Sequence, residues 1–124
     1  MIQNLHSCVL FCTDTTRSQA WYEAVGFVLA RQYNGMVWFA LGPVELMLHP
    51  SKEGPTGAIP QLKVTIDDLD ALFTAVGSAG LTPLDHQGDG SPLSGPVQRP
   101  WGAREFELED PDGHRWAFVE AASS

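Results

Sequence analysis

Four histidines and several carboxylates are the side chains of this 124-residue sequence that could ligate a metal ion. Glu45 and His49 lie in one apolar stretch, but their spacing of four residues separates them by roughly 13 Å in an extended strand. A metal ion lies about 2 Å from each of its ligands, so these two side chains cannot share one. His86 and His114 fall in or beside expected turns, where a surface role is the simpler interpretation. None of these residues forms an evident metal site without further partners.

Aromatic side chains point to a different chemistry, the binding of a flat or cationic molecule. Tyr33, Trp38 and Trp101 could present ring faces to a ligand, and Glu45 could pair with a ligand cation. Two stacked rings contribute about 0.5–1.5 kcal/mol beyond the area that they bury, and a cation over a ring gains further. Structural alternatives stay open: Trp101 could lock a loop in place, Trp38 could be a core residue, and Tyr33 could be a plain turn residue.

Strands and turns must position those residues, and the spacing of apolar residues predicts both. In the first half of the chain Asp14 offers a helix N-cap, Gly26 ends the helix, and Asn34-Gly35 is a hairpin signal. A helix is predicted at residues 17–25. Strands are predicted at residues 5–12, 27–32, 36–41 and 44–49.

The same order of elements starts again after a Pro- and Gly-rich linker at residues 51–59. Asp68 offers the cap of a second helix, and Asp110 to Gly113 is typical of a tight turn. A second helix is predicted at residues 69–76. Strands are predicted at residues 61–66, 81–86, 103–109 and 114–120. The sequence therefore predicts an α+β fold in a single domain, residues 1–124, with module one at about 1–50 and module two at about 60–124. Two short sheets of this kind can face one another and leave a cleft.

Two stretches carry a resemblance to a known family. One is Pro100-Trp101-Gly102 followed by Asp110-Pro111-Asp112-Gly113, and the other is Asp14 to Phe27 with Trp21-Tyr22. Together they resemble the glyoxalase/bleomycin resistance/dioxygenase (vicinal oxygen chelate) superfamily, and are most similar to its bleomycin-resistance-type binding proteins. The resemblance covers nearly the whole chain and implies two βαβββ modules that form an open, barrel-like cleft. It leaves the function open, because such a fold hosts enzymes and drug-binding proteins alike.

The resemblance also implies where a catalytic metal would be held, at four strand positions that point into the cleft. Alternation along the strands places Ser7, Glu45, Gln61 and Ala117 at those positions. Glu45 is a good ligand and Gln61 a weaker one, whereas a divalent ion held for catalysis needs about three protein ligands. The expectation is therefore a cleft with no metal cofactor. A divalent metal held by Glu45, Gln61 and His6 stays open if a bulge turns His6 inward.

The residues expected to line the cleft share the strand face of Glu45 or the aromatic character of a stacking site. Trp101 falls where bleomycin-binding relatives place a stacking ring, and Arg104, rather than its neighbour Glu105, is taken to face inward. The candidate ligand-binding residues are Tyr33, Trp38, Glu45, Met47, His49, Gln61, Trp101 and Arg104.

The depleted set of metal ligands favours a binding protein over an enzyme. The expected function is that of a bleomycin-resistance-type protein, which sequesters a planar or cationic aromatic compound, such as an antibiotic, in a metal-free cleft. A metal-dependent glyoxalase-like lyase or dioxygenase with displaced ligands is the alternative. A non-catalytic regulatory domain is a third interpretation that no particular residue favours.

The charge balance limits the partners. The net charge is −8, and it is uneven: residues 1–58 carry three basic and four acidic side chains, whereas residues 59–124 carry four basic and eleven acidic ones. This balance argues against a nucleic-acid partner, which would need a basic surface. It would suit a cationic ligand, although acidic residues also aid solubility. No apolar run approaches the roughly 18 residues of a membrane helix, and the N-terminus lacks the features of a signal peptide. A cytoplasmic location is therefore expected, and the resemblance implies a homodimer.

Overall fold

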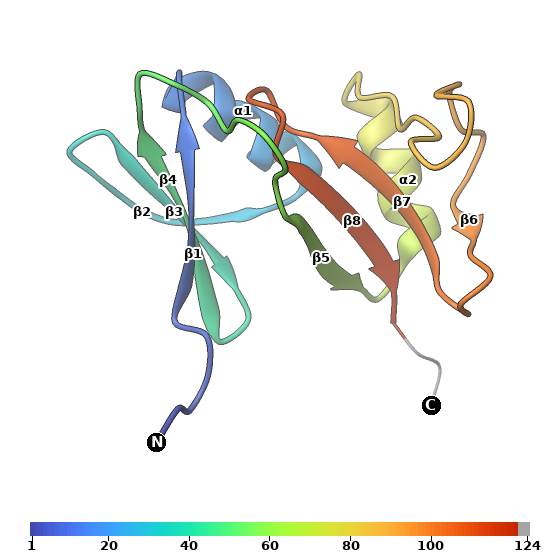
Figure 1. The fold of residues 1–124 in the computed structure, drawn as a ribbon, viewed down its shortest axis with the longest axis horizontal. Coiled ribbons are helices and arrows are strands. Elements are labelled where there is room, and N and C mark those ends of the chain that lie inside the picture. Colours follow the sequence, from blue (N-terminus) through green and yellow to red (C-terminus); the bar gives the residue numbers. More distant parts are fainter. Residues whose placement is uncertain (122–124) are drawn as a thin grey trace. The chain divides into compact units, whose positions relative to one another are not determined.

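Two four-stranded mixed sheets, each packed against one helix, make up residues 1–121, the part of the chain that the computed structural model describes (Figure 1). The strand order is β1-β4-β3-β2 in the first sheet and β5-β8-β7-β6 in the second. The pairs β1–β4 and β5–β8 are parallel, and the remaining pairs are antiparallel. The expected α+β fold with a doubled βαβββ order is confirmed. No helix in this part of the chain is long and apolar enough to cross a membrane.

The first sheet follows the alternation of apolar residues closely. Phe39, Leu46 and Leu48 are fully buried, and α1 packs against β3 and β4 with Tyr22 in the same core. Asn34 and Gly35 both have positive φ, 53° and 84°, as the predicted two-residue hairpin turn requires. The elements are β1 (Ser7–Cys12), α1 (Thr15–Val25), β2 (Val28–Tyr33), β3 (Met36–Leu41) and β4 (Val44–Pro50).

The second sheet confirms most of the predicted elements but not the strand at 81–86. Leu84 forms only an isolated bridge with Pro92, and the sheet edge is instead a two-residue strand, β6. Pro83 has no N–H to donate to a ladder, and its carbonyl accepts from Leu93 within the loop. The elements are β5 (Gln61–Ile66), α2 (Leu69–Ser78), β6 (Val97–Gln98), β7 (Arg104–Glu109) and β8 (Arg115–Glu120).

Helix α1 ends at the predicted residue, Val25, but it begins at Thr15, two residues before the predicted start. The Asp14 side chain accepts a hydrogen bond from the Arg17 N–H, and Gly26 terminates the helix in the left-handed region at φ 115°.

We expect Gly26→Ala to lower the free energy of unfolding by about 1–2 kcal/mol, because a Cβ strains this backbone conformation. Gly77→Ala, inside α2 with open space around its Cβ, is the matched control and should raise the same quantity by about 0.5–1 kcal/mol. Urea denaturation measures both, and shifts in the same direction would contradict the assignment of Gly26 as a cap.

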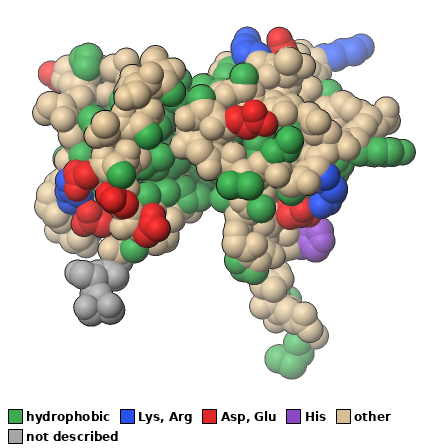
Figure 2. Space-filling view, turned by 180° about the vertical axis from the view of Figure 1, so that it is seen from behind, with side chains coloured by type: hydrophobic (Ala, Val, Ile, Leu, Met, Phe, Trp, Pro, Cys, Tyr) green, Lys and Arg blue, Asp and Glu red, His purple; other side chains and the backbone are tan. Residues whose placement is uncertain are grey.

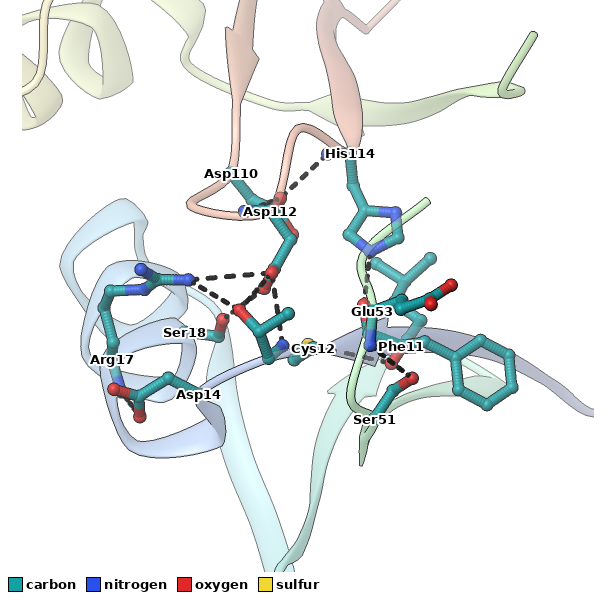
Figure 3. Close-up of polar contacts among 12 residues, drawn as sticks. Phe11, Cys12, Asp14, Arg17, Ser18, Ser51, Glu53, Asp110, Asp112 and His114 are labelled. Carbon is teal, nitrogen blue, oxygen red and sulfur yellow. Dashed lines mark hydrogen bonds and ion pairs between the residues drawn. The ribbon is translucent and has the colours of Figure 1, made fainter. Parts of the chain in front are cut away.

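The tight turn between β7 and β8 belongs to the first unit of the structure. Residues 1–58 with 110–114 form one compact unit, and residues 59–109 with the chain from Arg115 onward form another. The Tyr22 hydroxyl donates to the buried Asp110 carboxylate at 2.6 Å. His114 Nε2 lies 2.9 Å from the Phe11 carbonyl oxygen (Figure 3). The predicted turn at Asp110–Gly113 is confirmed, with Gly113 N–H donating to the Asp110 carbonyl. The two aspartates hold the turn onto Thr13 and α1, and the His114 ring contacts β1.

Candidate functional site

The face of the first sheet that lies opposite α1 carries most of the predicted ligand-binding residues. Because Phe39, Leu46 and Leu48 are buried beneath α1, their neighbours Trp38, Glu45, Met47 and His49 lie on the opposite face. The strand register places Trp38 beside Met47 and Met47 beside Val9. The strand faces inferred from alternation are therefore confirmed, whereas the ligand-binding roles stay predictions.

Arg31 is the functional candidate on this face that sequence analysis missed. A β-bulge between Leu29 and Arg31 shifts the register of β2, so that Arg31 lies opposite Trp38 instead of Val37. Its guanidinium carbon lies 4.6 Å from the centroid of the Trp38 ring. Its two terminal nitrogens lie 2.5 and 3.0 Å from the two carboxylate oxygens of Glu45. The face thus holds a planar cation between an aromatic ring and a carboxylate.

Exposed apolar side chains surround this arrangement. Val9 lies in the middle of the paired strand β1 and is 40% exposed. Phe11 lies near the end of the same strand and is 51% exposed. Phe11 meets the His49 ring edge-on at 5.6 Å between centroids. Hydrophobic side chains also reach the surface next to charged ones in the space-filling view (Figure 2). Exposed apolar residues that gather on one face are typical of a binding surface.

Tyr33 lies at the end of β2, on the same face as Arg31 by alternation, and is 69% exposed. It lines a hollow together with Thr16 and Gln19 of α1 and with Met36 of β3. Tyr33 therefore borders the first turns of α1 as well as the sheet, and its role as a second wall of a stacking site stays a prediction.

The second sheet carries a buried polar cluster on the face opposite α2. Glu105 and Glu107 of β7 are 1% and 2% exposed. Lys63 Nζ lies 3.5 Å from Glu105, whereas Arg99 and Arg115 lie 3.8 and 3.9 Å from Glu107. Glu107 also accepts a hydrogen bond from the predicted ligand residue Gln61.

Three buried atoms of this cluster have no hydrogen-bond partner among the residues that the structure describes. They are one carboxylate oxygen each of Glu105 and Glu107 and the Nε of Arg99. Buried polar atoms are almost always paired, so unpaired ones often mark a place where a ligand or water completes the bonding. Sequence analysis missed Glu107 and set Glu105 aside in favour of Arg104, although the alternation of both glutamates with Phe106 and Leu108 was a signal that could have placed them.

The expectation that Arg104 rather than Glu105 faces away from the helix is wrong. Arg104 shares the face of Phe106, which packs edge-on against Phe73 of α2. Its guanidinium pairs with Asp70 at the start of α2, at 2.5 Å, and with Glu120, at 2.7 Å. These ion pairs hold Arg104 on the helix side of the second sheet.

Trp101 lies in the turn between β6 and β7 and is 62% exposed. Lys63 Nζ lies 5.9 Å from the centroid of its ring and 3.5 Å from Glu105. The second sheet therefore repeats the combination found on the first, in which a basic side chain lies near both a tryptophan ring and a carboxylate.

The two cysteines do not provide a nucleophile. Both are free thiols, Cys8 half-buried and Cys12 fully buried. Burial raises the pKa of Cys12 to about 11, and it also raises the pKa of Cys8. A thiol must be deprotonated to attack a substrate, so both residues act as small core side chains at neutral pH.

Comparison with known proteins decides the family. The model described as the Glyoxalase/Bleomycin resistance protein/Dioxygenase superfamily matches residues 4–118. This chain belongs to that superfamily. None of the curated proteins matches the sequence.

Solved structures of the superfamily share the fold at low sequence identity. A glyoxalase/bleomycin resistance protein/dioxygenase from Nocardioides is 18% identical, with a TM-score of 0.75 over 100% of this chain and 87% of that one. A bleomycin-binding protein complexed with bleomycin is 21% identical, with a TM-score of 0.72 over 98% and 100%. Lactoylglutathione lyase from Agrobacterium tumefaciens is 20% identical, with a TM-score of 0.70 over 97% and 95%. At such identities the likeness establishes the fold and not the activity.

The residues expected at the superfamily's metal positions are poor ligands for a divalent ion, and a metal-free site stays a prediction. Glu45 is already paired with Arg31, and the Gln61 side chain donates to Glu107. Ser7 and Ala117 offer no imidazole or carboxylate. The exposed His6 lies 3.2 Å from the Ser7 hydroxyl. Within residues 1–121 no group of three or more His, Cys, Asp or Glu is placed to hold a metal.

Proposed function

We propose that this superfamily member is a small-molecule binding protein that sequesters a planar, cationic aromatic compound without a metal ion. The observation that carries the proposal is the recurrence of one arrangement on both sheets. Arg31 lies between Trp38 and Glu45 on the first sheet, and Lys63 lies near Trp101 and Glu105 on the second. An aromatic face and a carboxylate together attract a cation more strongly than either group alone.

The acidic balance of the chain and the exposed apolar residues of the first sheet support the same proposal. A net charge of −8 attracts cations over several ångströms, whereas the apolar surface accommodates an aromatic body. The bleomycin-binding relative makes an antibiotic of this kind the first ligand to test. A homodimer in the cytoplasm stays part of the proposal.

Titration of the purified protein with bleomycin, followed by tryptophan fluorescence, tests the proposal. We expect saturable binding that weakens by about two- to tenfold in Trp38→Leu and Trp101→Leu, because each variant loses one ring face. Trp21→Leu is the matched control, since Trp21 lies on α1 against Tyr22 and should leave the affinity unchanged.

Two results would count against this function. One is the absence of binding of bleomycin and of other cationic aromatic antibiotics. The other is a stoichiometric divalent metal in elemental analysis of protein that was never exposed to chelators, which would favour the metal-dependent lyase or dioxygenase.

A further inference from the structure

Arg31 occupies the place that a planar ligand cation would take on the first sheet. Its guanidinium lies over the Trp38 ring at 4.6 Å and meets both oxygens of Glu45 at 2.5 and 3.0 Å. This is the two-pronged pairing that planar cations with two parallel N–H donors make with carboxylates. The Trp38–Glu45 pair therefore has the geometry to hold such a cation, and the chain supplies one from its own β2.

The contacts of Arg31 are of a kind that a ligand can replace. Its side chain is 54% exposed and that of Glu45 is 28% exposed. Every residue of β2, the edge strand of the sheet, is exposed, so water reaches the arginine side chain along the strand. Exposed ion pairs and cation–ring contacts contribute little net stability, because water screens them. Arg31 can therefore swing into solvent at small cost.

An apolar row extends from Trp38 across the sheet. Trp38 lies beside Met47 on β4, and Met47 lies beside Val9 on β1. Adjacent strands are about 4.8 Å apart, so this row spans roughly 10 Å, about the length of a two-ring aromatic body. Val9 at 40% exposed leaves the far end of the row open to a ligand.

We propose that Trp38 and Glu45 form a binding site for an amidinium or guanidinium group carried on an aromatic body, and that Arg31 is a built-in competitor which the ligand displaces. This inference rests on the proposed function and narrows its ligand to one chemical class. It also assigns Arg31 a role that sets the affinity threshold: only a cation that stacks and pairs better than arginine is bound.

Isothermal titration with benzamidine, a planar aromatic amidinium, tests the displacement, and neutral benzamide is the matched ligand control. We expect Arg31→Ala to bind benzamidine about tenfold more tightly than the wild-type protein, because it removes the competitor. Benzamide should show no such gain. Adding Glu45→Gln to Arg31→Ala should abolish the gain.

Lys52→Ala removes one positive charge from an exposed position of the same unit and should leave the affinity unchanged. Thermal unfolding of each variant verifies that it is folded.

Three results would overturn the inference: no gain for Arg31→Ala, an equal gain for benzamide, or a gain that survives Glu45→Gln. Bleomycin binding by the wild-type protein is measured separately. If the wild-type protein binds bleomycin but Arg31→Ala gains nothing for benzamidine, the competitor role fails while the proposed function stands. If the wild-type protein does not bind bleomycin or related antibiotics, the proposed function itself fails.

Discussion

Glu107→Ala is expected to lower the free energy of unfolding by about 3–5 kcal/mol, the usual cost of leaving a buried charge without its partner. The Arg99 side chain is only 8% exposed, and it lies 3.8 Å from the Glu107 carboxylate. Arg115 is 37% exposed and can turn into water when Glu107 is lost, but Arg99 cannot do so without rearrangement. Urea denaturation followed by far-ultraviolet circular dichroism measures the loss.

A double substitution separates the cost of a broken pair from the value of the pair itself. Glu107→Met combined with Arg99→Met removes both charges and keeps similar volumes, so we expect a stability within about 1 kcal/mol of the wild type, or above it. Glu109→Ala, at an exposed position of the same strand, is the control and should change the unfolding free energy by less than about 0.5 kcal/mol. A loss below about 1 kcal/mol for Glu107→Ala alone would contradict the burial of an essential ion pair.

The double variant also bears on function. If apolar residues replace both charges without loss of stability, the ion pair does not contribute net stability to the fold. Glu105 and Glu107 each keep a carboxylate oxygen that is ion-paired but has no hydrogen-bond partner among the described residues, on the face that also carries Lys63. If the double variant is stable but loses bleomycin binding, the polar cluster serves the ligand and not the fold.

Local rules predicted the elements and the strand faces of the first sheet well. Asp14 caps the start of α1 because its side chain accepts a backbone hydrogen bond, and Gly26 ends the helix because it adopts the left-handed conformation. Both residue types can be recognised in the sequence. Trp38 and Glu45 share a face because the side-chain period of a strand is fixed at two.

The features that were missed depend on breaks in those rules. Arg31 reaches Trp38 only because β2 contains a bulge, and without it the side chain would face α1. The sequence could not show whether Arg104 or Glu105 faces α2. The deciding contact is between Arg104 and Asp70 on α2, and these residues are 34 positions apart. The strand expected at 81–86 fails because its backbone groups bond within the loop.

The turn at Asp110–Gly113 shows how far a correct local prediction can reach. Its composition predicted a tight turn, which is confirmed, but it did not predict the partners of its carboxylates. Asp112 accepts hydrogen bonds from Thr13, 99 residues earlier, and from Ser18, 94 residues earlier. Contacts over such separations depend on the whole chain and are not visible in a sequence pattern.

Asp112→Ala is expected to lower the free energy of unfolding by about 2–3 kcal/mol at pH 7, because a buried, charged hydrogen-bond acceptor is lost. The Asp112 side chain is 3% exposed and accepts from Thr13 N–H at 3.2 Å, from the Thr13 hydroxyl at 2.6 Å and from the Ser18 hydroxyl at 3.3 Å. Arg17 lies 3.6 Å away, and the carboxylate lies at the start of α1, where the helix dipole favours negative charge. Urea denaturation measures this loss as well.

The effect of Asp112 should depend on pH in a defined direction. Partial burial alone would raise the pKa of this carboxyl, but hydrogen bonds from Thr13 and the charge of Arg17 outweigh burial and hold the pKa below its ordinary value of 3.8. Ionised Asp112 therefore stabilises the folded state fully above its unfolded pKa of about 3.9, and this stabilisation is lost as the pH falls through the lower folded pKa. The difference in unfolding free energy between the wild type and Asp112→Asn should stay constant from about pH 7 to pH 5 and shrink below about pH 4.

Glu53→Gln is the matched control for this pH dependence, because Glu53 is an exposed carboxylate of the same compact unit. At pH 7 its unfolding free energy should stay close to that of the wild type. A difference between wild type and Asp112→Asn that is unchanged at pH 3 would mean that charge at Asp112 contributes nothing. The turn would then be held onto α1 by hydrogen bonds that do not depend on charge at Asp112, such as the one from the Tyr22 hydroxyl to Asp110.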